Sequence, residues 1–165
     1  MKEKLKKYIK EIITFLIFVM IISNVISLYK SRNLNKEALV QVNLTLITSK
    51  KYKFTDDKPI LIHYWATWCP ICKVEAQNIQ KISKYYNVLT IAVKSGSNND
   101  IQRYMNENEL NFNVYNDDNG FFAQKSKIAV YPTTFIYDKN KNLLFSEVGY
   151  TSTVGLWIRM WWAGL

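Results

Sequence analysis

The fold is decided by residues 60–73, which read ILIHYWATWCPICK. The segment 60–66 is short and apolar apart from His63, which is typical of a central strand that is buried on both faces. Residues 70–86 follow with a helical pattern, and Pro70 would occupy the first turn, a position that suits proline. The side chains expected to face inward from this helix are Ile71, Val74, Ile79 and Ile82. Two cysteines, Cys69 and Cys72, therefore lie where a buried strand passes into a helix.

This position has chemical consequences for both cysteines. The first turn of a helix offers unpaired N–H groups and the positive end of the dipole, and both stabilise a thiolate. The two intervening residues let the second sulfur come close enough to close a small disulfide ring. We therefore predict that Cys69 attacks the disulfide of a partner and that Cys72 resolves the mixed disulfide. Pro70 lacks an N–H, so it changes the donors around Cys69 and should affect the reduction potential.

Length and composition limit the class of protein. A chain of 165 residues that is 48% hydrophobic suits one domain and is too apolar for intrinsic disorder. Two cysteines and one histidine exclude a disulfide-dense scaffold and a His-rich metal cluster, and two cysteines alone cannot complete a zinc site. The net charge of +9 is concentrated in residues 1–37, which hold eight Lys and Arg against three Glu. The later lysines are scattered among acids, so no basic face for nucleic acid is expected.

Residues 1–29 are interpreted as a basic cytoplasmic start followed by a membrane anchor. The segment 12–28 carries no charge, and at ~1.5 Å per residue it covers about 25 Å, close to the ~30 Å hydrocarbon core of a bilayer. Five lysines precede it and fewer basic residues follow, which predicts that the amino terminus stays in the cytoplasm and the rest is exported. A cleaved signal peptide and a buried core helix are the alternatives. The apolar run is long for the former and lacks the polar stripe of the latter.

The remaining chain alternates between strands and helices after a linker over 30–37. Strands are expected over 40–46, 52–54, 88–93, 112–115, 133–137 and 143–148, the last two forming a hairpin through residues 138–142. Helices are expected over 100–109, capped by Asn98 or Asn99, from 120 to about 127, and from Thr153 onward. The last helix carries Trp157 and Trp161, which either pack on the sheet or rest on a membrane surface. This order indicates an α/β sandwich.

The segment 60–73 resembles the active-site segment of the thioredoxin superfamily. Trp-Ala-Thr-Trp-Cys-Pro-x-Cys, followed by Lys73-Val74-Glu75, is similar to the membrane-anchored extracytoplasmic branch that includes TlpA, ResA and DsbE-type proteins. Within it, the short oxidoreductases associated with suppression of copper sensitivity are the most similar. Residues 130–135, VYPTTF, resemble the superfamily's cis-proline loop, and Gly149 matches its late glycine. The resemblance covers about residues 38–150 and implies a thioredoxin-like fold with a central mixed sheet flanked by helices.

The resemblance also implies roles for residues around the cysteines. His63 occupies the position of a buried Asp that assists proton transfer at the resolving cysteine of thioredoxin. It either takes that role or is a hydrogen-bonded core residue. Glu75 either tunes or deprotonates Cys72, or is a solvated acid of the first helix. Trp68 is expected to form part of the wall of the site and to shield the sulfur of Cys69.

A cis bond before Pro132 would expose the backbone of Tyr131 for pairing with an extended substrate segment. Tyr131 is larger than the residues commonly found there, which bears on substrate preference.

The predicted function is that of a thiol:disulfide oxidoreductase that exchanges disulfides with protein substrates and acts as a reductant. It would need no dissociable cofactor beyond its own disulfide and would receive electrons from a donor in the membrane. The resemblance and the charge pattern place it as a single-pass protein of the bacterial inner membrane, with the domain 38–165 in the periplasm or outside the cell. The alternative is a thiol module that binds copper or haem apoproteins, because two thiolates can hold Cu(I). A covalent haem site would need histidine where Lys73 stands.

Overall fold

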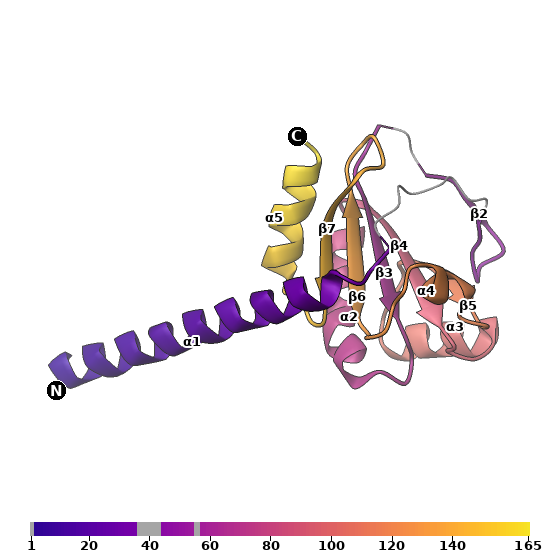
Figure 1. Cartoon of the computed structure of the whole chain (residues 1–165). Coiled ribbons are helices and arrows are strands. Elements are labelled where there is room, and N and C mark those ends of the chain that lie inside the picture. The colour runs from indigo at the N-terminus through magenta and orange to yellow at the C-terminus, as the bar shows by residue number, and fades with distance from the viewer. Residues whose placement is uncertain (1, 36–43, 55–56) are drawn as a thin grey trace.

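The computed structural model describes residues 2–35, 44–54 and 57–165 (Figure 1). Its centre is a five-stranded sheet in the order β5-β4-β3-β6-β7. The strands are β3 (Ile60–Trp65), β4 (Asn87–Val93), β5 (Asn113–Asp117), β6 (Thr133–Tyr137) and β7 (Leu143–Val148). Strand β3 pairs in parallel with β4 and antiparallel with β6, so the sheet is mixed. All six residues of β3 are buried, which confirms the prediction of a central strand covered on both faces.

Helices and loops cover the two faces of the sheet in separate cores. Helices α2 (Pro70–Ser83), α3 (Asn98–Glu107) and α5 (Thr153–Ala163) share one core with Leu61 and Trp65 of β3. The short helix α4 (Phe121–Lys125) and the hairpin β1 (Leu44–Thr45) and β2 (Lys51–Tyr52) share the other with Ile62 and Tyr64. Because side chains alternate along a strand, His63 lies on the same face as Leu61 and Trp65, under α2.

The inward face of α2 differs from the prediction. Ile71 is 51% exposed and Val74 is 68% exposed, so both expectations of inward packing are wrong, whereas Ile79 and Ile82 are fully buried as predicted. The buried stripe starts at Cys72, which the site fixes against the core, and continues at spacings of three and four through Ala76. Ile71 and Val74 fall beside this stripe. The helix also ends at Ser83 and not at residue 86, and Tyr85 and Tyr86 follow it as irregular chain.

The start of α3 also needs a correction. Ser97 caps the helix, in place of the predicted Asn98 or Asn99. The hydroxyl of Ser97 accepts a hydrogen bond from the N–H of Asp100, and the carboxylate of Asp100 accepts one from the N–H of Ser97. This reciprocal capping box satisfies two free N–H groups, which a single asparagine would not. The helix accordingly runs over 98–107 and not over 100–109.

The last helix begins at Thr153 as predicted, but its tryptophans do not form the core. The inner side of α5 consists of the buried residues Leu156, Met160 and Ala163, while Trp161 is 58% exposed. Trp157 packs against the rings of Tyr85 and Tyr86 at the domain surface. The predicted strand over 40–46 lies partly outside the described residues, and its described part contains β1.

Helix α1 (Lys2–Ser31) runs out of the domain as one long rod (Figure 1). Its segment Tyr8–Ser31 is long and apolar enough to cross a membrane, and among the described residues it is the only such helix. Its carboxyl end contacts β7, and Leu34 beyond it is buried in the core that contains β1 and β2.

Candidate active site

Cys69 and Cys72 form a disulfide at the junction of β3 and α2, with their Cα atoms 5.2 Å apart. Cys69 is the N-cap of α2, and its sulfur accepts a hydrogen bond of 3.2 Å from the N–H of Cys72. Pro70 occupies the first helical position, as predicted, so it offers no N–H to that sulfur. The N–H of Cys72 therefore points at the sulfur of Cys69, where it favours a thiolate once the disulfide is reduced.

The two sulfurs differ in their access to solvent. Cys69 is 5% exposed and Cys72 is 1% exposed. That Cys69 reacts first with a partner and Cys72 resolves the mixed disulfide stays a prediction.

The loop before β6 lies at the same edge of the sheet as the disulfide. Thr133, the first residue of β6, pairs with Tyr64 near the end of β3, from which the chain enters the active-site turn. The bond between Tyr131 and Pro132 is cis, as the resemblance implies. The carbonyl of Pro132 accepts a hydrogen bond of 2.8 Å from the N–H of Gly149. Gly149 has a φ of 97°, a conformation that favours glycine, so this late glycine lets the chain turn next to the proline loop.

Trp68 stands at the rim of the site and is 60% exposed. Its indole N–H donates a hydrogen bond of 3.1 Å to the carbonyl of Lys94, and its ring meets that of Tyr131 edge to face at 5.7 Å. Tyr131 in turn packs against the core that contains both cysteines. The two rings thus form an aromatic rim beside the disulfide, in agreement with the expected place of Trp68 in the wall of the site.

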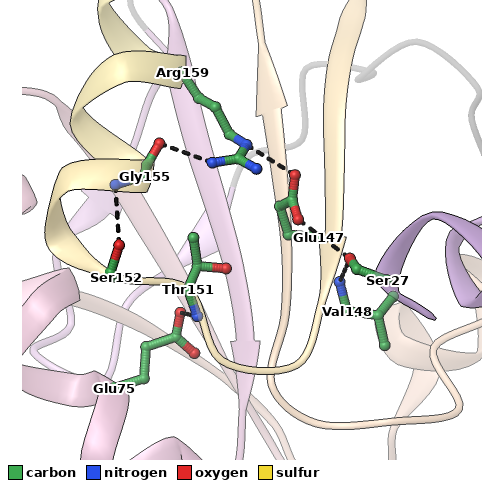
Figure 2. A network of polar contacts seen from close by, with 8 residues as sticks. All are labelled: Ser27, Glu75, Glu147, Val148, Thr151, Ser152, Gly155 and Arg159. Carbon is green, nitrogen blue, oxygen red and sulfur yellow. Dashed lines mark hydrogen bonds and ion pairs between the residues drawn. The ribbon is translucent and has the colours of Figure 1, made fainter. Parts of the chain in front are cut away.

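Glu75 is fully buried three residues after Cys72 on the inner side of α2. Its Oε1 accepts a hydrogen bond of 3.0 Å from the N–H of Thr151 (Figure 2). Its Oε2 has no hydrogen-bond partner among the described residues. Burial raises the pKa of Glu75 to about 8, helped by the charge of Glu147 and opposed by the bond from Thr151. Glu75 is therefore a largely protonated buried acid near neutral pH, and the alternative of a solvated acid is wrong.

His63 is also buried, at 2% exposure, and its Nδ1 shares a hydrogen bond of 2.9 Å with the hydroxyl of Thr134. Burial lowers the pKa of His63 to about 3. A histidine with that pKa stays neutral at physiological pH and is a weak proton acceptor. These observations favour the interpretation of His63 as a hydrogen-bonded core residue.

No sequence signal predicts the polar contacts around Glu75. Thr151 and Glu147 come from the chain that follows the β6–β7 hairpin and from β7 itself, more than 70 residues away from Glu75. No motif or spacing connects them, and only the folded topology brings them to α2. Among the described residues there is no cluster of three or more His, Cys, Asp or Glu side chains that could hold a metal ion.

A mixed sheet with a CxxC disulfide at the start of its first covering helix, and a cis-proline loop at the same edge, defines a thioredoxin-like fold. The chain belongs to the AhpC/TSA family, whose model matches residues 34–146. It is 28% identical over 164 residues to a thioredoxin-like protein of Haemophilus influenzae, a match that covers 97% of each chain.

Two further relatives match part of the chain. The thiol-disulfide oxidoreductase ResA of Oceanobacillus iheyensis is 32% identical over 89 residues, which cover 52% of this chain and 46% of ResA. The crystal structure of StoA from Bacillus subtilis superposes with a TM-score of 0.64 at 18% identity, over 73% of this chain and 96% of that one. The similarity to StoA supports the fold, and the similarity to ResA is one of sequence over about half of this chain.

Proposed function

We propose that this protein is an extracytoplasmic thiol:disulfide oxidoreductase that exchanges disulfides with other proteins through Cys69 and Cys72. The observation that carries the proposal is the disulfide itself, in which the sulfur of Cys69 caps α2 and is the more exposed of the two. The named activity of ResA, which is 32% identical to this chain over 89 residues, supports it.

The reaction follows from the two positions. In the reduced protein the Cys69 thiolate attacks a substrate disulfide, forms a mixed disulfide and releases one substrate thiolate. Cys72 then attacks the sulfur of Cys69, which reforms the internal disulfide and releases the second substrate thiolate. Two electrons pass from the protein to its substrate, and a donor dithiol must return them by the reverse sequence.

Glu75 is proposed to hold the proton that Cys72 loses and regains. The two residues are three positions apart on the buried side of α2, a spacing that makes them neighbours on a helix. Cys72 must lose a proton before it can attack Cys69, and a nearly buried thiol cannot readily pass it to bulk water. Only the ionised form of Glu75 can take this proton, directly or through one water, at the carboxyl oxygen that has no partner among the described residues. Because the pKa of Glu75 is about 8, this form becomes more abundant as the pH rises toward 8.

Protein substrates are proposed to dock on the rim of the site. Trp68 and Ile71 are exposed apolar side chains on either side of the nearly buried Cys69, and Tyr131 stacks on Trp68. An extended substrate segment could lie along Tyr131 and Pro132 and bring its disulfide to Cys69. Aromatic side chains of this kind commonly dominate the affinity of a protein interface.

The direction of electron flow is proposed to be from a membrane donor, through this protein, to its substrate. Helix α1 would anchor the protein in the bacterial inner membrane with the domain outside the cytoplasm. Its carboxyl end lies beside Val148, which pairs with Thr133 next to the proline loop. The edge of the sheet that carries the disulfide therefore lies close to the anchor, within reach of a donor in the same membrane.

Reduction of insulin by dithiothreitol tests the proposal, with the full chain held in phosphatidylcholine nanodiscs. We expect the protein to accelerate the reaction and both Cys69→Ser and Cys72→Ser to abolish the acceleration. The matched control, Lys139→Ser in the exposed β6–β7 turn, should retain it. Equal rates for all four proteins would refute the proposal.

A further inference from the structure

The end of α1 is fixed to the domain by hydrogen bonds from a buried side chain. The hydroxyl of Ser27 donates to Oε2 of Glu147 at 3.2 Å and accepts from the N–H of Val148 at 2.9 Å (Figure 2). Ser27 and Ser31 are both buried, at 8% and 2% exposure. Because this contact forms within the helix itself, the domain sits directly against the end of the proposed membrane span.

Helix α5 is attached to the same strand. Nε of Arg159 forms an ion pair of 2.8 Å with Oε1 of Glu147, and Nη1 donates to the carbonyl of Gly155 at 3.0 Å (Figure 2). Glu147 thus links the hydroxyl of Ser27 on one side to Arg159 on the other. Arg159 is the only charged residue of α5, and its guanidinium is held by these partners at the inner side of the helix.

The outer side of α5 is therefore apolar and uncharged. We call it the aromatic face. It consists of Val154, Ile158, Trp161 and Trp162 at helical spacing, continued by Leu165 two residues after the helix ends, and these side chains are between 58% and 75% exposed. Figure 1 shows α5 on the side of the domain from which α1 runs out, and it crosses the direction of α1. Large contiguous apolar surfaces are uncommon on soluble proteins, and they often mark a site that binds another protein or a membrane.

We propose that the aromatic face of α5 lies on the surface of the same lipid bilayer that α1 spans. The inference rests on the proposed anchoring by α1. The uncharged run of α1 ends at Tyr29, just before Lys30, so Ser27 lies at the level where the hydrocarbon core gives way to the headgroups. Helix α5, joined to Ser27 through Glu147, lies next to this level and runs across the anchor, as an interfacial helix does. Tryptophan side chains favour the headgroup region.

The surroundings favour lipid over a protein as the occupant. A cleft of about 570 Å³ separates the end of α1 from the start of α5 and opens beside the anchor, with Ile26, Tyr150 and Ser152 among its lining residues. Lipid must surround α1 wherever it spans a bilayer, so it is already present at the mouth of this cleft. Gly155 and Arg159 of α5 also line this cleft, so α5 itself borders it.

Two attachments would restrict how the domain moves. A domain tied to the membrane by α1 alone could turn about the axis of that helix. Contact through α5 would prevent this rotation and hold the disulfide edge of the sheet at one height above the bilayer. A donor and a substrate that approach from fixed directions would then find Cys69 in a constant orientation.

Tryptophan quenching by brominated lipid tests the contact in the full chain, reconstituted in phosphatidylcholine nanodiscs that contain phosphatidylcholine brominated near the headgroup. Quenching should be strong in the natural protein. Trp161→Phe/Trp162→Phe should lose most of it, because phenylalanine keeps the apolar surface but removes the reporter. Trp68→Phe, which removes an equally exposed tryptophan from the active-site rim, should retain it.

Three results would overturn the inference, and the first of them leaves the proposed anchoring by α1 intact. Suppose that the fluorescence of the two variants is quenched to the same extent while the chain resists extraction by alkaline carbonate. In that case the anchoring stands and the contact by α5 is refuted. If quenching is weak and discs hold two copies whose association is abolished by Trp161→Ser/Trp162→Ser, which removes the apolar surface, a second copy covers the face and the inference is wrong. If carbonate releases the chain, the proposed anchoring fails together with the inference, while insulin reduction still reports separately on the disulfide.

Discussion

The N–H of Thr151 donates a hydrogen bond of 3.0 Å to Oε1 of the buried Glu75. This contact joins the helix that carries the disulfide to the loop between β7 and α5. The same loop leads to Gly155 and Arg159, which is paired with Glu147 (Figure 2). The carboxyl group behind Cys72 therefore depends for its environment on the region where the domain meets the end of α1.

Replacement of Glu75 by glutamine should slow the step in which Cys72 resolves the mixed disulfide. The amide cannot accept a proton, so the pH dependence of this step should lose the component with a pKa of about 8. We expect a loss of roughly tenfold to a hundredfold, in the range of one general acid or base. Rapid mixing with a disulfide-bonded peptide over a pH series measures the rate.

Glu107→Gln is the matched control, since Glu107 is exposed on α3, away from the site. Its pH profile should match that of the natural protein. If Glu75→Gln also leaves the profile unchanged, Glu75 has a structural role only.

The buried Glu75 and His63 should give the stability of the domain opposite dependences on pH. The pKa of Glu75 is raised in the fold from 4.5 to about 8, so its contribution is complete below pH 4.5 and is lost as the pH rises toward 8. The pKa of His63 is lowered from 6.5 to about 3, so its contribution is complete above pH 6.5 and is lost as the pH falls toward 3. Stability should therefore be greatest at moderately acidic pH.

Thermal unfolding of the oxidised full chain in a mild detergent measures this profile. Glu75→Gln should remove the loss on the alkaline side, which is of the order of a few kcal/mol for a shift of this size. A decline above pH 6.5 that is the same in Glu75→Gln would show that other groups cause it.

Replacement of Trp68 by alanine should slow the reaction with protein substrates but not the reaction with small disulfides. We expect the rate with a protein disulfide to fall roughly tenfold, because the loss of an aromatic anchor from an interface costs about 1–2 kcal/mol or more. Exchange with glutathione disulfide should be unchanged or faster, since Cys69 loses a neighbour but keeps its helix cap. Tyr85→Ala, an exposed aromatic residue after α2, is the control and should affect neither rate. Equal losses with both substrates would argue against a docking role.

Equilibrium with glutathione determines the direction of electron flow. A reduction potential below about −220 mV would support the proposed reductant, and one near −120 mV would make the protein an oxidant. Gel-shift alkylation of the full chain across a series of glutathione buffers gives the potential. Binding of Cu(I) that survives competition by glutathione would instead support the alternative of a copper-binding module.

Local signals in the sequence were sufficient for the central part of the fold and for the disulfide. The apolar run of β3, the spacing of Cys69 and Cys72, and Pro132 each act over a few residues, so the chain alone could predict their places. The inward face of α2 was predicted incorrectly because Ile71 and Val74 are apolar, while the burial of Glu75 depends on a partner far along the chain. Hydrophobic pattern cannot reveal a buried acid whose hydrogen bond comes from a distant loop.

The contact between α1 and β7 could not be predicted from the sequence for the same reason. Ser27 is a small polar residue inside an apolar helix, and Glu147 lies between Ser146 and Val148 on an outer strand. Each is unremarkable alone, and only the topology of the sheet brings them together. The exposure of Trp161 likewise depends on which side of α5 packs against the core.

Trapping of the reaction intermediate tests the central claim most directly. Cys72→Ser should accumulate a mixed disulfide between Cys69 and insulin that dithiothreitol releases, because the residue that would resolve it is missing. Cys69→Ser should form none, because Cys72 is almost completely buried, at 1% exposure. Equal adducts from the two variants, or none from either, would contradict the account.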